Sequence, residues 1–391
     1  PEVWLTLKDS SYYVRVNALE SSDFSALSHQ VRTLEKKFSL CGNRLLYCST
    51  ASDFFCPITE HSVRSNILER RVGLPWHRIV YEKPFGKDLV SAHEINACIA
   101  QYLEDEQVYR IDHYLTEELV SNIALVRFSN CIFEPLWNNR YISHVQIILN
   151  EKITVGNRGS YYDAYGALKD MVQNHALELL ALITMEAPRQ LTGEYIRQER
   201  ARVLNKVRCM DALLGQYEGY RNEPSVNPQS ITETFAALQL FIDNPRWAGV
   251  PFYIKTGKAL HKKDTSVHIK FKQVDCLRVQ QGRPPANCLT IQVTPNPSFA
   301  LSLNVKQPGF SHEVIPVAME FCHSCIFQGH GIESYEVLLQ EVMSGEHSVS
   351  VRFDEIESAW KIVDSIKDMN LPLHEYAPES FGPLELINFE N

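Results

Sequence analysis

The chain has 391 residues, of which 45% are hydrophobic and 22% charged, and this excludes a disordered chain, a collagen and a coiled coil. Its 38 basic and 47 acidic side chains give a net charge of −9, which argues against nucleic acid or anionic membrane as a partner. No apolar run approaches the roughly 18 residues that span a bilayer, and the irregular spacing of the ten cysteines indicates reduced thiols in a cytoplasmic protein.

The first 110 residues alternate strand-like and helical stretches. Short buried strands are predicted at 44–48 and 78–81, with a helix at 55–71 between them. An amphipathic helix is expected to begin near Asp88. Strands separated by helices indicate a parallel α/β sheet.

A Lys-Pro pair follows the second of these strands, in the segment Glu82-Lys83-Pro84-Phe85-Gly86. Ligands bind at strand ends in open α/β sheets, so Lys83 could hold a phosphate or a sugar hydroxyl. The segment could equally be a Pro-Gly turn with a solvated lysine.

An acid, an imidazole and a phenol stand in succession at Asp112, His113 and Tyr114. A carboxylate can orient a histidine base, and a histidine with a tyrosine can bind phosphate oxygens. The same residues could also form a polar helix start, with Asp112 or Thr116 as its cap.

Beyond residue 140 the pattern changes to period-two alternation, which favours an antiparallel sheet with one polar face. Strands are predicted at 267–271, 289–293, 301–303 and 349–351, and helices at 167–185 and 357–369. The fold class is therefore α/β plus α+β, with a larger second domain that has a mainly antiparallel sheet and helices.

His175 lies on the apolar face of the helix predicted at 167–185, where a histidine is more often a core residue than a catalyst. Asp170 precedes it by five residues, which is about 140° around an α-helix. An orienting carboxylate for His175 must then come from another segment, and Asp112 is a candidate.

Two further motifs are weaker. Thr256-Gly257-Lys258 and the basic residues after it suit an anionic substrate or a solvated loop. A single C-x-x-C at 322–325 without a second ligand pair is poor evidence for zinc, and we expect no metal. No G-x-G-x-x-G loop follows a strand near the N-terminus.

Taken together, several segments resemble the glucose-6-phosphate dehydrogenase family, in the same order as in that family. The matching strings are 82–86 (EKPFG), 109–115 (YRIDHYL), 133–138 (FEPLWN), 170–175 (DMVQNH), 257–260 (GKAL) and 357–360 (ESAW). The resemblance implies oxidation of glucose 6-phosphate to 6-phosphogluconolactone with reduction of NADP, in the pentose phosphate pathway of glucose metabolism.

The resemblance also implies a role for each matching residue. His175 is the expected general base and Asp112 its orienting carboxylate. The expected substrate contacts are Lys83, His113, Tyr114, Glu151, Asp170, Lys258 and Lys263. Lys83, Ser49 and Thr50 are expected to contact NADP, and the peptide bond before Pro84 is expected to be cis, as in the family.

This sequence departs from the family pattern at three places. The strand, Gly-rich turn and helix that open the family's coenzyme domain have no counterpart, so we expect weak or absent NADP binding. Glu117 stands where the family has a phosphate-binding lysine, which predicts weakened substrate binding. Asp264 and Gln292 replace basic residues that hold a second, structural NADP in some members, so we expect no such site.

Two hypotheses follow. In the first, residues 1–110 are a remnant of a Rossmann-like NADP-binding domain and 111–391 a C-terminal domain of an active, cytoplasmic dehydrogenase. The family implies a homodimer formed through the sheet of the second domain. In the alternative, the chain is a catalytically impaired or inactive relative that serves as a scaffold or regulatory subunit.

Overall fold

The computed structural model describes residues 2–274, 284–309, 313–322 and 333–386. The chain divides into two compact units. The first comprises the chain up to Gly86 together with Val90–Ile111, and the second comprises Lys87–Leu89 and Asp112–Asn391.

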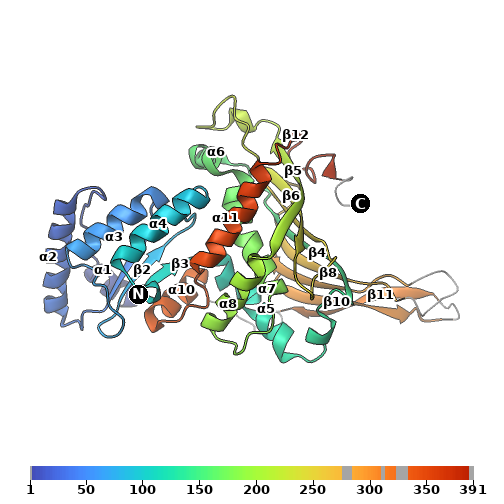
Figure 1. Cartoon of the computed structure of the whole chain (residues 1–391), viewed down its shortest axis with the longest axis horizontal. Helices are drawn as coiled ribbons and strands as arrows, with labels where there is room; N and C mark the ends of the chain where they lie inside the picture. Colours follow the sequence, from blue (N-terminus) through green and yellow to red (C-terminus); the bar gives the residue numbers. More distant parts are fainter. Residues whose placement is uncertain (1, 275–283, 310–312, 323–332, 387–391) are drawn as a thin grey trace. The chain divides into compact units, whose positions relative to one another are not determined.

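The first unit is a three-stranded parallel sheet with helices in its connections (Figure 1). Its elements are α1 (Glu2–Asp9), α2 (Ser21–Phe38), β1 (Arg44–Cys48), α3 (Phe55–Arg64), β2 (His77–Tyr81), α4 (Leu89–Tyr102) and β3 (Val108–Arg110). β2 lies between the other two strands, with Leu46 beside Ile79 and Val80 beside Tyr109. The β–α–β–α–β order is that of a Rossmann-like half, and it brings the carboxyl ends of all three strands to one edge.

The predicted strands of this unit are confirmed, but the predicted helix at 55–71 is too long. It ends at Arg64 because Asn66 adopts a left-handed conformation with φ of 57°. The Lys83–Pro84 peptide bond is cis, as the resemblance implies. The expectation that all cysteines are reduced is wrong, because Cys56 and Cys98 form a disulfide between α3 and α4. Spacing in the sequence carried no sign of this pair, whose members stand 42 residues apart.

The second unit is built on a nine-stranded, mainly antiparallel sheet in the order β11-β10-β9-β8-β4-β7-β6-β5-β12. Its strands are β4 (Ile142–Asn150), β5 (Val207–Tyr217), β6 (Phe235–Ile242), β7 (Phe252–Gly257), β8 (Asp264–Phe271), β9 (Cys288–Thr294), β10 (Ser298–Lys306), β11 (Val314–Cys322) and β12 (Leu373–Tyr376). Two pairs are parallel, β4 with β7 and β12 with β5. The predicted strands near 267, 289 and 301 are confirmed as β8, β9 and β10.

The second unit also contains helices, of which α5, η6 and α11 contact strands of this sheet (Figure 1). The helices are α5 (Glu118–Ser129), α6 (Gly159–Ala167), the π-helix η6 (Leu168–Ala176), α7 (Leu177–Thr184), α8 (Gly193–Leu204), α10 (Ser334–Ser344) and α11 (Phe353–Lys367). α11 buries Ile356, Trp360 and Val363, which recur at helical spacing. A short 3₁₀ turn, η3 (His113–Thr116), opens this unit.

Two predictions for this unit need correction. The strand predicted at 349–351 is not formed: Ser350 makes only a single bridge, and its neighbours Val349 and Val351 are buried in the segment before α11. The helix predicted from residue 357 begins at Phe353, because the carboxylate of Glu355 accepts a hydrogen bond from the backbone N–H of Arg352 at 2.7 Å. None of the described helices is both long and apolar enough to cross a membrane.

Candidate active site

A buried carboxylate–imidazole pair lies in the second unit. Asp112 precedes η3 and His175 lies near the end of η6, and Nδ1 of His175 is 2.5 Å from Oδ1 of Asp112. The two residues are 2% and 1% exposed. With Nδ1 hydrogen-bonded to the carboxylate, a proton exchanged with a substrate would be carried on Nε2.

The surroundings of Asp112 favour its ionised form. Burial by itself would raise the pKa of this carboxyl, but the charge and hydrogen bond of His175, the charge of His113 and the backbone N–H of Tyr114 lower it to about 2. Tyr114 donates that backbone hydrogen bond at 2.9 Å, so Asp112 also caps η3. The predicted cap is therefore confirmed, and the role of Asp112 as the orienting carboxylate of a base stays a prediction.

Two rings from η3 pack against the imidazole of His175. The ring of Tyr114 stacks on it at a centroid distance of 4.1 Å, and the ring of His113 meets it edge-on at 4.7 Å. Burial raises the pKa of the Tyr114 hydroxyl to about 12, although a hydrogen bond with Thr265 acts in the opposite direction. Tyr114 therefore stays protonated at neutral pH and can donate to an anion.

The helix that carries His175 is a π-helix, not the predicted α-helix. Its hydrogen bonds join residues five apart, so Asp170 and His175 lie one turn apart on the same side, and the expected separation of about 140° is wrong. Asp170 is 4% exposed and accepts a hydrogen bond from the hydroxyl of Tyr161 at 3.2 Å. The expectation that His175 pairs with Asp112 is nevertheless confirmed.

Glu151 and Lys258 form an ion pair at the ends of two adjacent parallel strands. Glu151 follows β4 and Lys258 follows β7, and Nζ of Lys258 lies 2.5 Å from Oε2 of Glu151. The side chain of Lys258 is only 5% exposed, and its ammonium lies 5.0 Å from the ring centroid of Tyr162. The hydroxyl of Tyr376 donates to the carbonyl oxygen of Lys258 at 2.8 Å, which fixes the backbone there.

The remaining residues of the predicted substrate set lie differently. Lys263 is exposed, beside an ion pair of 2.8 Å between Lys262 and Asp264. Glu117 accepts a hydrogen bond at 3.2 Å from the hydroxyl of Ser334, the first residue of α10. A carboxylate at a helix N-terminus is stabilised by the helix dipole, so Glu117 has a structural partner that the sequence did not indicate.

The predicted coenzyme contacts lie in the first unit. Ser49 and Thr50 follow β1 and are exposed, and Lys83 follows the neighbouring strand β2. These residues place two hydroxyl groups and one cation at the carboxyl edge of the parallel sheet. That donor set fits an anionic, hydroxyl-rich dinucleotide.

One side-chain cluster has the spacing of a metal site. Asp112, His113 and His175 each offer a ligand atom, and these atoms lie within 4.8 Å of one another. The hydrogen bond between Asp112 and His175 uses Nδ1 of the imidazole, which is the contact expected between a base and its orienting carboxylate. The C-x-x-C motif lies largely outside the described residues, because only Cys322 is described.

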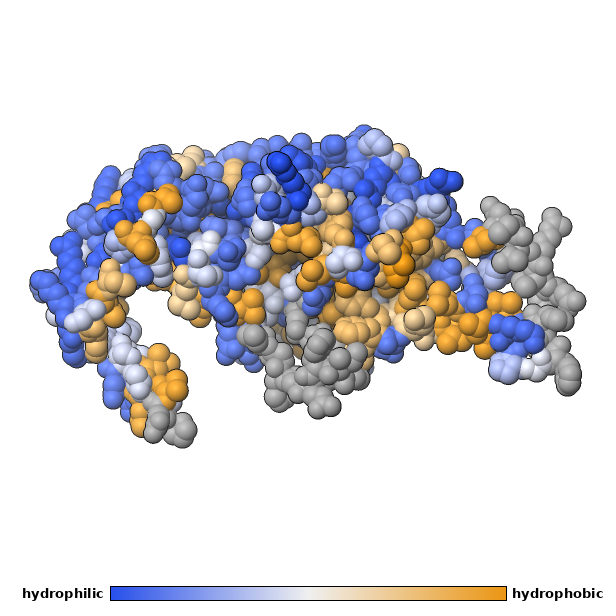
Figure 2. All heavy atoms as spheres, turned by 90° about the horizontal axis from the view of Figure 1, so that it is seen from below, coloured by the Kyte–Doolittle hydropathy of each residue, from blue (hydrophilic) through white to orange (hydrophobic). Residues whose placement is uncertain are grey.

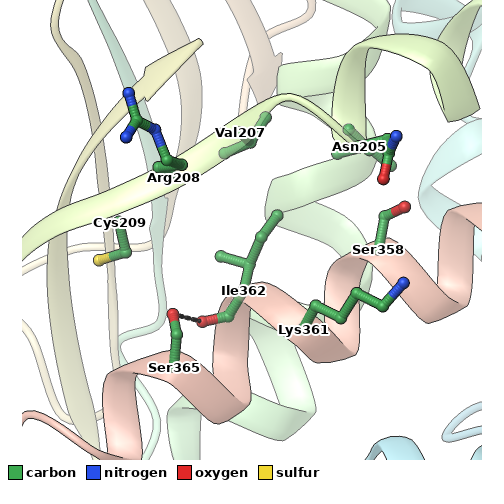
Figure 3. Close-up of a pocket in the computed structure, with 9 residues that line it drawn as sticks. Asn205, Val207, Arg208, Cys209, Ser358, Lys361, Ile362 and Ser365 are labelled. Carbon is green, nitrogen blue, oxygen red and sulfur yellow. Dashed lines mark hydrogen bonds between the residues drawn. The ribbon is translucent and has the colours of Figure 1, made fainter. Parts of the chain in front are cut away.

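A pocket of about 300 Å³ lies elsewhere in the second unit, between the end of α8, the start of β5 and α11 (Figure 3). Its two cations, Arg208 and Lys361, are paired with Asp243 and Glu357. None of the residues predicted for the site lines this pocket.

Sequence reasoning missed the groups that hold the site residues in place. These are Thr265 at Tyr114, Tyr161 at Asp170, Tyr162 and Tyr376 at Lys258, and Ser334 at Glu117. Each stands far from its partner in sequence or in a different element. The one available signal was the Tyr161-Tyr162 pair shortly before Asp170, two large polar aromatics at a helix otherwise rich in small residues.

The chain combines a unit built on a parallel sheet with a unit built on a mainly antiparallel sheet, and the second unit holds a buried, hydrogen-bonded Asp–His pair. Two family models match the chain: "Glucose-6-phosphate dehydrogenase, NAD binding domain" over residues 1–122 and "Glucose-6-phosphate dehydrogenase, C-terminal domain" over 124–390. The chain belongs to the glucose-6-phosphate dehydrogenase family of oxidoreductases.

Individual relatives agree with this assignment. Glucose-6-phosphate 1-dehydrogenase of Chlamydia muridarum is 38% identical over 380 residues, which cover 92% of this chain and 75% of the relative. The Bacillus subtilis protein of the same name is 37% identical over 96% of this chain and 81% of its own length. The crystal structure of glucose-6-phosphate 1-dehydrogenase from Mycobacterium avium has a TM-score of 0.85 at 31% identity, over 98% of this chain and 81% of that one. A glucose-6-phosphate dehydrogenase solved with glucose 6-phosphate has a TM-score of 0.88 at 30% identity, over 96% and 80%.

Proposed function

We propose that this chain oxidises glucose 6-phosphate at C1 to 6-phosphogluconolactone and reduces NADP. The observation that carries the proposal is the buried pair of His175 and Asp112, 2.5 Å apart. An orienting carboxylate that fixes the tautomer of an imidazole is what a general base requires. Membership of the family and a match to a relative solved with glucose 6-phosphate support the choice of substrate.

In the proposed reaction, Nε2 of His175 takes the proton of the C1 hydroxyl. The oxygen–hydrogen electron pair forms the second C–O bond while C1 loses a hydride, so the sugar is oxidised by two electrons. The coenzyme, when bound, accepts that hydride. The imidazolium that forms is stabilised by the carboxylate of Asp112, which stays ionised.

The remaining site residues are proposed to bind the sugar phosphate. His113 and Tyr114 present an imidazole and a protonated phenol to the phosphate. Lys258 and Lys263 add positive charge, and Glu151 and Asp170 accept hydrogen bonds from sugar hydroxyls. Lys83 is proposed to contact both substrate and coenzyme, and Ser49 and Thr50 to contact the coenzyme.

We further propose that residues 1–110 act as the coenzyme-binding domain and 111–391 as the substrate domain. NADP is the proposed coenzyme, and the expected weakness of its binding stays a prediction. The comparisons give no support to a non-catalytic scaffold. A cytoplasmic location is proposed for the same activity.

A homodimer formed through the sheet of the second unit is proposed as the working assembly. Figure 2 shows hydrophobic side chains gathered on the arm formed by β10 and β11. On this arm Val305, Val317 and Met319 are exposed by 42%, 44% and 64%. β11 is also an outer strand of the described sheet, so a second copy of the chain could cover its apolar side chains.

The test is a spectrophotometric assay with glucose 6-phosphate and either NADP or NAD, following absorbance of the reduced nicotinamide. Turnover is expected with the unmodified chain and is expected to vanish in His175→Asn. His29→Asn, which replaces an exposed histidine of α2, is the matched control and should retain activity. A folded chain without turnover would contradict the proposed function and favour the scaffold.

A further inference from the structure

A second group of buried charges lies beside the proposed base. Glu178, Arg200 and Glu355 are 3%, 1% and 0% exposed, and they come from α7, α8 and α11. Nε of Arg200 lies 2.8 Å from Oε2 of Glu355 and 3.5 Å from Oε2 of Glu178. One guanidinium therefore lies between two carboxyl groups in the core, which we call the Arg200 cluster.

The Arg200 cluster is coupled to the catalytic pair through the chain and through charge. Glu178 stands three residues after His175, where the π-helix passes into α7. The charge of Asp112 acts on both Glu178 and Arg200. A change in the charge of the cluster is therefore felt at Asp112 and at the imidazole that it holds.

The two carboxyl groups of the cluster cannot both be ionised cheaply. Burial and the neighbouring Glu355 raise the pKa of Glu178, and burial also raises the pKa of Glu355. Glu355 is the carboxyl group that ionises more easily, because it has the shorter contact to Arg200 and accepts the capping hydrogen bond from the backbone N–H of Arg352. Glu178 is consequently the carboxyl group that is more easily protonated.

We propose that Glu178 and Glu355 bind one proton between them, next to Arg200, so that the cluster has no net charge. The cluster then holds His175 in position and sets how readily this imidazole accepts a proton. The proposal rests on the proposed role of His175 as the base. With Glu178 protonated, the charges of Arg200 and Glu355 cancel, so the cluster adds no net charge to that of Asp112 beside the imidazole. If the carboxylates were lost, the uncompensated guanidinium would oppose the imidazolium that forms during the reaction.

Other charged and titratable groups around the helix of His175 are the same in every variant used below, so their effects cancel in a comparison. They are Lys169 and Asp170 on the helix, His113 and Tyr114 of η3, Tyr161 and Tyr162 of α6, Glu151 and Lys258 beyond β4 and β7, and Glu233, Asp364 and Lys367 near Lys169.

The test compares two variants that differ by one charge. In Glu178→Gln/Glu355→Gln the guanidinium of Arg200 loses both partners, and the pKa of His175 is expected to fall by about one pH unit. Adding Arg200→Met to that variant removes the charge, and the pKa is expected to return toward its original value. Glu178→Gln alone, which replaces a neutral carboxyl by a neutral amide, is expected to leave the pKa unchanged.

The pKa of His175 is measured in two ways. Histidine-labelled protein titrated by NMR reports it directly, with the resonance assigned from its absence in His175→Asn. The acidic limb of kcat/KM reports the same group during turnover. If the chain shows no turnover but the ordered NMR shifts occur, the proposed function fails and the inference stands.

A cluster that only stabilised the fold would give a different result. The pKa of His175 would then be the same in the triple variant as in the double variant. Equal pKa values of His175 in the two variants would overturn the proposal. If the double variant does not fold, infrared spectroscopy of the unmodified chain and of Glu178→Gln tests the proposal instead. The C=O band of a buried protonated carboxyl is expected at neutral pH in the unmodified chain and should be lost in Glu178→Gln, whereas a chain without that band would have no shared proton.

Discussion

Nδ1 of His175 lies 2.5 Å from Oδ1 of Asp112, although the two residues are separated by 63 positions in the sequence. The contact joins the end of a π-helix to the residue that caps the first turn of the second unit. The position of the proposed base therefore depends on both the π-helix and the capped turn, and each of these has its own hydrogen bonds. Substitutions on either side should consequently affect activity and stability together.

Replacement of Asp112 by asparagine should lower kcat strongly while the chain stays folded. The amide cannot stabilise the imidazolium and can impose the wrong tautomer on His175, so a loss of about a hundred- to ten-thousand-fold is expected. Steady-state kinetics would measure it, with circular dichroism as the check on folding. Asp105→Asn changes an exposed partner of Arg110 and serves as the control. A kcat within a few-fold of the unmodified value would exclude Asp112 from the mechanism.

The same carboxylate should make stability depend on pH in the acid range. Its pKa is lowered to about 2 in the folded chain from 3.8, so its contribution is complete above about pH 4 and is lost as the pH falls toward 2. The difference corresponds to about 2 kcal/mol of unfolding free energy. Urea unfolding of the unmodified chain and Asp112→Asn between pH 6 and pH 3 should show their difference beginning to close below pH 4. A constant difference across that range would contradict the lowered pKa.

Glu117 should weaken the binding of glucose 6-phosphate. Its carboxylate lies within electrostatic range of Tyr114, which is proposed to contact the phosphate. Affinity is therefore expected to increase from Glu117 to Glu117→Gln and again to Glu117→Lys, by about tenfold or more for the full charge reversal. Calorimetric titration at two salt concentrations would measure this, and the gain should shrink at the higher one.

The contact of Glu117 with Ser334 gives this prediction a separate control. Ser334→Ala removes the hydroxyl but leaves the charge at position 117. It should leave substrate affinity nearly unchanged and lower stability by about 1 kcal/mol at most. If Ser334→Ala alters affinity as much as Glu117→Gln does, the effect comes from the position of α10 rather than from charge.

Lys258 should matter more for substrate binding than the lysines that follow it. It is buried against Tyr162 and paired with Glu151, whereas Lys262 is exposed and paired with Asp264. Lys258→Met is expected to raise KM at least about tenfold, because it removes a buried charge-assisted contact and leaves Glu151 unpaired. Lys262→Met is the matched control, with KM expected within about twofold. Equal KM values for the two variants would remove Lys258 from the site.

The proposed homodimer predicts that a charge on the apolar arm separates the subunits. Met319→Glu places a carboxylate on the 64% exposed side chain of β11 and should shift the chain from dimer to monomer in sedimentation experiments. Ile231→Glu, at a position that is 81% exposed outside the arm, is the control and should stay dimeric. A monomeric unmodified chain would contradict the proposal from the start.

The sequence by itself determined the fold class and named the residues of the proposed site. Alternation of apolar residues placed β8, β9 and β10, because a strand with one polar face buries every second side chain, and short apolar runs placed β1 and β2. Local motifs marked Asp112 and His175, whose pairing was expected because no carboxylate on the same helix was thought to reach the imidazole. These features depend either on residues that are neighbours in the chain or on the chemistry of a side chain, which is the same at any position.

Only the tertiary structure decided the π-helix, the disulfide between Cys56 and Cys98, and the contacts of Glu117 with Ser334 and of Arg200 with its two carboxyl groups. Each of these joins distant segments or depends on packing that overrides local preference, as at Val349 and Val351, where an alternating pattern forms no strand. Desolvation acts in the same way. The sequence shows Glu178 only as one acidic residue among many, but in the folded chain burial and the neighbouring Glu355 raise the pKa of its carboxyl group.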